Sequence, residues 1–115
     1  MSVERTAKGL IAAAAWAVAA WGCSGDDTSL SPLAQEGRRI YGNVCIACHN
    51  GDPTRDGSLG PAIAGSSREL LEARVVRGEY PPGYTPKRSS VTMPRFESLA
   101  DQVDALAAYL AEAGS

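Results

Sequence analysis

The chain has 115 residues, a length that predicts one domain, and its formal net charge at pH 7 is −2. No stripe of basic residues runs through it, so the charge pattern gives no sign of a nucleic-acid partner, and we expect none. No internal repeat and no alternating strand pattern is present, and the elements predicted below are all helices.

The N-terminal segment is typical of an export signal. Arg5 and Lys8 supply positive charge, and the uncharged apolar run 10–20 follows them. This run is shorter than the roughly 20 residues that cross a bilayer, but it fits the core of a signal peptide. A buried core helix is the alternative. The position behind positive charges and the small residues at the end favour a signal peptide, which we assign to residues 1–22.

Cys23 follows a segment that resembles the lipobox of bacterial lipoproteins, in which the cysteine receives the lipid and becomes the new N-terminus. Ala20 stands where leucine is usual, and Trp21 is bulky for its place. Ordinary cleavage that leaves a stray thiol is therefore the alternative, but the odd number of cysteines favours lipidation. We expect residues 23–31 to be a lipidated tether that holds an exported domain to a membrane on the bacterial periplasmic side.

The remaining residues, 32–115, begin with a predicted amphipathic helix. The Ser31 hydroxyl would cap its first turn, and Pro32 suits the first helical position because that position needs no backbone N–H. Glycine within a helix costs about 1 kcal/mol relative to alanine, so Gly37 indicates a close packing contact. The residues at spacings of three and four are Leu33, Gly37, Ile40, Tyr41, Val44, Cys45 and Cys48.

Two further helices are predicted after loops rich in glycine and proline at 50–66 and 79–97. The second helix opens at the capping box Ser66–Glu69 and stops at Gly78. The third covers about residues 98–112, with an apolar face formed by Leu99, Val103, Leu106, Ala107 and Leu110.

The motif with the clearest chemistry is Cys-Ile-Ala-Cys-His at positions 45–49. Cys45 and Cys48 can form thioethers to the two vinyl groups of one haem, and His49 can give a ring nitrogen to the iron. The 93 residues that remain after removal of 1–22 form a small core, which usually needs a disulfide, a metal or a cofactor. We therefore expect one covalently bound haem c.

Three other interpretations of this motif compete with haem attachment. A thioredoxin-like redox pair would need a βαβ context, which the pattern lacks. A zinc site would need a fourth ligand, and Cys23 would have to leave its tether to supply it. A disulfide between Cys45 and Cys48 would leave His49, the only histidine of the chain, without a role.

The second axial ligand of a haem iron follows by elimination. Electron-transfer haems are commonly held by His with Met or by two His, and no second histidine exists. Met1 would be lost with the signal, which leaves Met93 as the methionine of the mature chain. It lies in a proline-rich loop next to Pro94. A methionine that merely fills the core is the alternative.

Taken together, these residues resemble class I c-type cytochromes, the small monohaem kind. The resemblance covers nearly all of residues 32–113. It implies an all-α fold, the cytochrome c fold, with about three to four helices packed around one haem. Besides Cys45, Cys48 and His49, it rests on Gly37, Tyr41, Leu59-Gly60-Pro61, Gly78, Met93-Pro94-Arg95-Phe96, Leu99, Leu106, Tyr109 and Leu110.

The resemblance also implies two specific contacts. The first and last helices would cross near Gly37, with Tyr41 packed on the face that carries Tyr109. The backbone carbonyl of Pro61 would accept a hydrogen bond from the second ring nitrogen of His49. A ligating histidine needs such an acceptor to fix its orientation.

One feature of some relatives has no counterpart, because both tryptophans of the chain lie in the predicted signal. The tryptophan that bonds a haem propionate would have to be replaced, with Tyr80, Tyr84, Lys87 and Arg88 as candidates. Lys87, Arg88 and Arg95 could also form a positive rim for an acidic partner. Exposed tyrosines and scattered solvated charges are the alternatives.

A haem iron held by both His49 and Met93 has no open position for a substrate, so we expect a one-electron carrier and not an enzyme. Its partners would be redox proteins that dock through small, weak interfaces. The same chain could be a subunit of a respiratory or dehydrogenase complex. A haem enzyme or gas sensor with a labile Met93 is the alternative from another class.

Overall fold

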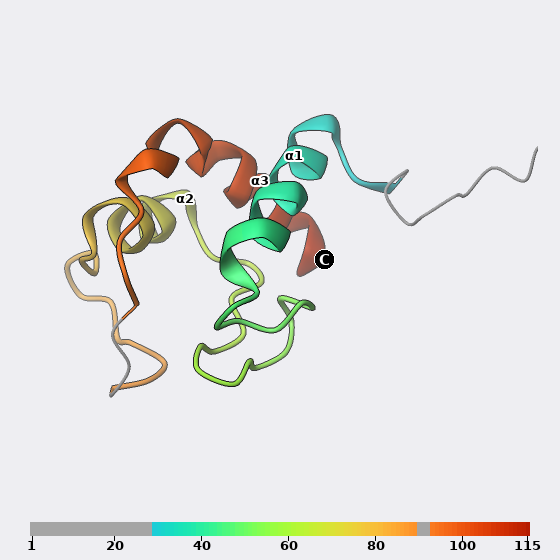
Figure 1. The fold of residues 1–115 in the computed structure, drawn as a ribbon. Helices are drawn as coiled ribbons and strands as arrows, with labels where there is room; N and C mark the ends of the chain where they lie inside the picture. Colours follow the sequence, from blue (N-terminus) through green and yellow to red (C-terminus); the bar gives the residue numbers. More distant parts are fainter. Residues whose placement is uncertain (1–28, 90–92) are drawn as a thin grey trace, which may run out of the picture.

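The computed structural model of the chain describes residues 29–89 and 93–115. The predicted signal peptide and Cys23 lie outside these residues. Every regular element in the described ranges is a helix, which confirms the predicted all-α fold (Figure 1). In chain order the elements are α1 (Pro32–Ile40), the π-helical η2 (Tyr41–Cys45), α2 (Arg68–Leu71), the π-helical η3 (Glu72–Arg77), the 3₁₀ helix η4 (Glu97–Gln102) and α3 (Val103–Ala113).

The first helix starts where the sequence predicts. The backbone N–H of Ala34 donates to the Ser31 hydroxyl at 3.2 Å, and Pro32 occupies the first turn. Its buried face differs by one position, because Leu33 is 51% exposed whereas Ala34 is fully buried. The buried spacing therefore runs from Ala34 through Gly37 to Ile40, a strict helical stripe, and Leu33 lies just outside it.

The second helix opens one residue later than predicted. Ser67 is the capping residue and accepts the backbone N–H of Leu70 at 3.1 Å. The Ser66 hydroxyl donates instead to the carbonyl of Ile63 at 2.6 Å, so it closes the preceding turn. Gly78 ends the helical segment with φ +70°, the left-handed conformation that favours glycine at this position.

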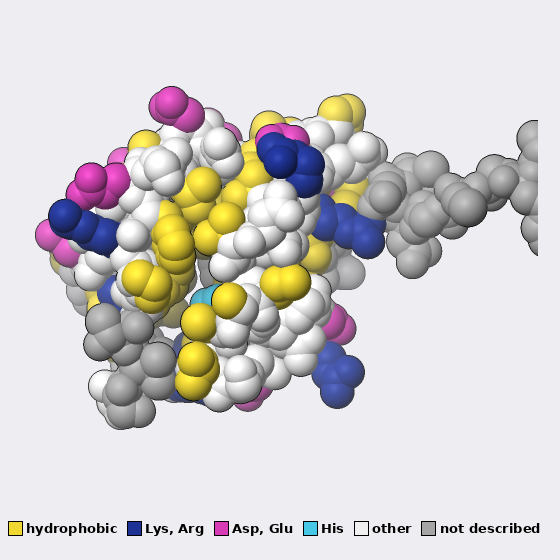
Figure 2. All heavy atoms as spheres, viewed as in Figure 1, with side chains coloured by type: hydrophobic (Ala, Val, Ile, Leu, Met, Phe, Trp, Pro, Cys, Tyr) yellow, Lys and Arg dark blue, Asp and Glu magenta, His cyan; other side chains and the backbone are white. Residues whose placement is uncertain are grey.

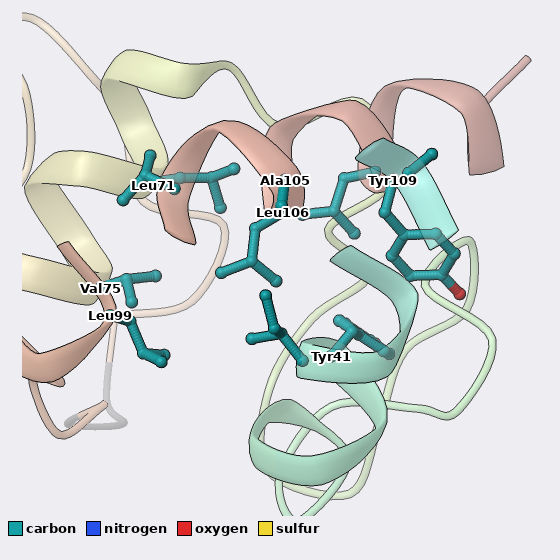
Figure 3. Close-up of a cluster of buried hydrophobic side chains, with 11 residues drawn as sticks. Tyr41, Leu71, Val75, Leu99, Ala105, Leu106 and Tyr109 are labelled. Carbon is teal, nitrogen blue, oxygen red and sulfur yellow. The ribbon is translucent and has the colours of Figure 1, made fainter. Parts of the chain in front are cut away.

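The first and last helices cross at Gly37, as the resemblance implies. A Cβ at Gly37 would lie 2.8 Å from the Cβ of Tyr109 and 2.6 Å from the carbonyl carbon of Ala105. The rings of Tyr41 and Tyr109 pack beside this crossing, with centroids 5.5 Å apart and planes tilted by 55° (Figure 3).

The rest of the core joins α3 to the other helices. Leu106 is buried between Tyr41 on one side and Leu71 on the other (Figure 3). Leu99 and Val75 bring η4 and η3 into the same cluster. No helix in the described residues is long and apolar enough to cross a membrane.

Candidate functional site

The end of η2 presents the Cys-Ile-Ala-Cys-His segment on one wall of a cavity. The carbonyl of Cys45 accepts the backbone N–H of Cys48 at 3.2 Å and that of His49 at 2.9 Å. This tight turn at the helix end brings all three side chains to the same cavity wall.

The cavity has a volume of about 290 Å³ and is mainly apolar. His49, the single histidine, lies at the edge of a hollow bordered by hydrophobic side chains (Figure 2). Met93, partly buried against the core, lines the same cavity. The aliphatic and aromatic walls are formed by Val44, Ile63, Leu70, Leu71, Val75, Phe96, Leu99, Leu106 and Leu110.

The His49 ring is oriented by the loop that contains Pro61. Its Nδ1 lies 2.8 Å from the Pro61 carbonyl oxygen, which can only accept, so Nδ1 carries the proton. This leaves Nε2 as the ring nitrogen with a lone pair for a metal. The contact is the one that the resemblance implies for Pro61.

Gly60 allows the Pro61 loop to lie against the ring. A Cβ at Gly60 would lie 2.5 Å from Nδ1 and 2.9 Å from Nε2 of His49, closer than any side chain could pack. The backbone N–H groups of Leu59 and Gly60 donate to the Cys48 carbonyl at 3.2 and 2.9 Å, which fixes the loop to the end of the helix.

The thiol environment disfavours a redox-active pair. Burial raises the pKa of the Cys45 thiol to about 11, so this group is protonated at neutral pH. Reactive redox cysteines need the opposite, a lowered pKa that yields the thiolate. Among the described residues, moreover, no three His, Cys, Asp or Glu side chains gather as a metal site.

All four polar candidates predicted near the cofactor line the cavity, namely Tyr80, Tyr84, Lys87 and Arg88. The two tyrosine rings stack, with centroids 5.4 Å apart and planes within 12°. Lys87 and Arg88, however, both donate to backbone carbonyls of the loop that contains Pro61. Their cations are therefore already engaged.

The predicted positive rim is broken up by carboxylates. Arg95 pairs with Glu97 at 2.9 Å, and Arg88 lies 3.8 Å from Asp56. Arg95 does not line the cavity. These neighbours favour the alternative of scattered solvated charges.

Arg74 is a cavity residue that the sequence reasoning missed. Its guanidinium carbon lies 4.2 Å from the centroid of the Tyr80 ring, within range of a cation–π contact. A signal was available, because Arg74 follows Leu70 by four residues and Leu71 by three, and so shares their helix face.

The donor set and the walls fit a flat, mainly apolar prosthetic group. Two thiols separated by two residues stand beside an imidazole with one nitrogen free to bind iron, and a thioether lines the same space. A porphyrin with two vinyl groups matches these donors, whereas a bare metal ion would leave the apolar walls without a partner.

Comparison with known families agrees with this chemistry. The model of the family described as cytochrome c oxidase, cbb3-type, subunit III matches residues 32–110. No curated protein and no solved structure gives a significant match.

Proposed function

Because the chain belongs to the family of cytochrome c oxidase, cbb3-type, subunit III, and is thus a small c-type cytochrome, we propose that Cys45 and Cys48 hold one haem c and that His49 and Met93 bind its iron. Membership implies haem-based electron transfer. The finer proposal is a one-electron carrier, with no catalysis of its own.

One observation carries the axial ligation. The only imidazole of the chain lines an apolar cavity beside the two thiols, and its Nδ1 proton is bound to the Pro61 carbonyl. This hydrogen bond fixes the tautomer and makes Nε2 a better electron donor. Met93 lines the same cavity, and it is the methionine that removal of the signal would leave.

The side chains around the cavity then set the redox behaviour. Bound haem supplies the one-electron Fe(II)/Fe(III) couple. A thioether from Met93 favours the reduced state relative to a second imidazole. Apolar walls such as Leu106 and Leu110 exclude water, which disfavours the extra positive charge of the oxidised state.

We also propose an exported, lipid-anchored protein. Residues 1–22 would be removed, Cys23 would carry the lipid, and residues 23–31 would form the tether. The Ser31 backbone N–H and hydroxyl bind the Glu112 carboxylate at 2.9 and 2.5 Å, so a pull on the tether would act on the ends of α1 and α3. The residues of the haem motif, Cys45, Cys48 and His49, lie in other segments of the chain.

The family description favours a place in an oxidase complex with redox partner proteins. We propose that the domain passes electrons there as a subunit. Purification from membranes under mild detergent would test this. Oxidase subunits in the same fraction would support the subunit, and a protein that purifies alone would support a free shuttle.

The decisive experiment is the optical spectrum of the mature protein, oxidised and reduced, with a pyridine haemochrome assay. Low-spin bands, a c-type haemochrome and the weak red band of an iron–methionine bond are expected. Met93→Leu keeps the apolar bulk but should abolish the red band and lower the midpoint potential. A high-spin spectrum in the wild type would instead favour a haem enzyme or gas sensor.

A further inference from the structure

Two basic side chains bridge the two loops that border the cavity. Lys87 Nζ donates to the carbonyl of Ala62 at 2.7 Å, and Arg88 Nη1 donates to the carbonyl of Leu59 at 3.1 Å. Leu59 and Ala62 stand on either side of the pair Gly60-Pro61. The two hydrogen bonds therefore hold the peptide segment that orients His49 from both ends.

This segment is held by local backbone bonds, such as the Gly57 N–H to the Gly60 carbonyl at 2.8 Å and the Ile63 N–H to the Pro53 carbonyl at 2.9 Å, but Pro61 itself contributes no donor. Proline has no backbone N–H, so Pro61 cannot anchor its own position through a donor. Its carbonyl must nevertheless stay 2.8 Å from His49 Nδ1. The neighbouring peptides supply the support, and the bonds from Lys87 and Arg88 reach them from the described residues of the 79–89 loop.

Asp56 also contacts this segment and lies close to Arg88. Its Oδ1 accepts the backbone N–H of Ala62 at 2.8 Å, and its Oδ2 lies 3.8 Å from Arg88 Nη2. The Asp56 side chain is 70% exposed, so the ion pair adds little energy. The bonds from Lys87 and Arg88 to the carbonyls of Ala62 and Leu59 join this segment to the loop at 79–89.

We propose that Lys87 and Arg88 are positioning residues that keep the Pro61 carbonyl aligned with His49 Nδ1. Lys87 and Arg88 precede Met93 by six and five residues in the chain, and all three side chains line the cavity. The inference rests on the proposed function, because the orientation of His49 matters where His49 binds iron.

The experiment compares Lys87→Met and Arg88→Met with the wild-type holoprotein. Arg95→Met is the matched control, since it removes the same charge from a side chain that does not line the cavity. Hydrogen exchange is measured by NMR in the reduced state, at the His49 Nδ1 proton and at the amides of Leu59 and Gly60. The loss of one hydrogen bond should speed exchange at these sites about tenfold.

The proposal is supported if exchange becomes faster only at these sites in both Met variants and stays unchanged in the control. The conservative variant Lys87→Arg should then exchange at the wild-type rates. Unchanged rates in the Met variants overturn the proposal. A uniform rise that includes amides of α1 and α3 also overturns it, because that result means general destabilisation. Unchanged exchange with an altered pH dependence of the midpoint potential would assign the two cations to a haem carboxylate instead.

Failure of the proposed function would look different. A folded protein without haem would refute that function, yet the same amide exchange at Leu59 and Gly60 would still decide whether Lys87 and Arg88 hold the loop.

Discussion

At the scale of single residues, the space beside His49 leaves no room for a side chain at position 60. We predict that Gly60→Ala will displace either the imidazole or the loop, because the new methyl group would lie 2.5 Å from Nδ1. Forced overpacking of this kind costs about 1–3 kcal/mol. The midpoint temperature of thermal unfolding should fall, and the midpoint reduction potential of the holoprotein should change.

Gly42→Ala is the matched control for this substitution. Gly42 is the second residue of η2, and a Cβ built at Gly42 would have no other atom within 4 Å. It should be neutral or stabilise the protein by about 0.5–1 kcal/mol. Equal effects of the two substitutions would show that the tight contact at Gly60 has no consequence.

Tyr41 gives a prediction about pH. Its hydroxyl donates to the Asn50 carbonyl, and burial raises its pKa from 10.0 to about 12. Above pH 10 the unfolded chain loses this proton while the folded protein keeps it, so stability falls as pH rises from about 10 to 12.

Tyr41→Phe should therefore be less stable than the wild type at neutral pH, by about 1 kcal/mol for the lost hydrogen bond. The deficit should shrink or reverse at about pH 11.5, because the variant has no proton to lose at this site. Denaturant unfolding at both pH values measures it. A deficit that is the same at both would contradict the assigned role of burial.

At the scale of elements, the crossing of α1 and α3 depends on one missing side chain. A Cβ at Gly37 would meet the backbone of Ala105 and the Cβ of Tyr109, and a backbone cannot move aside as a flexible side chain can. We predict that Gly37→Ala separates the helices and costs about 3 kcal/mol or more, beyond any gain in helix propensity. Denaturant unfolding of the holoprotein, again beside Gly42→Ala, measures this loss.

Local signals made most of the elements predictable. Ser31 with Pro32 and Gly78 each act through their own turn, and the structure places helix ends at both. Two predictions were wrong by one residue. Ala34, and not Leu33, faces the core, and Ser67, and not Ser66, caps the second helix. Only packing against another element decides that choice.

Local sequence signals could not predict the contacts between segments that are distant in the chain. The Pro61 contact to His49 came from the family resemblance, since no periodicity relates residues 12 apart in a loop. The bonds of Lys87 and Arg88 join segments 25 and 29 residues apart and end on backbone carbonyls, which every residue type carries alike. The sequence therefore could not indicate to which carbonyls Lys87 and Arg88 would donate.

At the scale of the whole molecule, several residues of the hydrophobic core also line the cavity. Tyr41 and Tyr109 pack at the α1–α3 crossing, but Leu71, Leu99 and Leu106 each turn part of their surface to the cavity. The space between these side chains has a volume of about 290 Å³, so the apolar walls do not pack directly against one another there. A whole domain has a stability of only about 5–15 kcal/mol, and a chain that packs its core around such a space has little apolar contact to lose.

We therefore predict that the chain without haem is largely unfolded, and that Cys45→Ala or Cys48→Ala impairs maturation. Cys23→Ser is the control, because it should lose the proposed lipid but keep the haem spectrum and the thermal transition. Circular dichroism during heating, with and without haem, measures the difference. A cooperative transition in the haem-free chain would mean that the helices close over the cavity by themselves, and the apolar walls would then need another explanation.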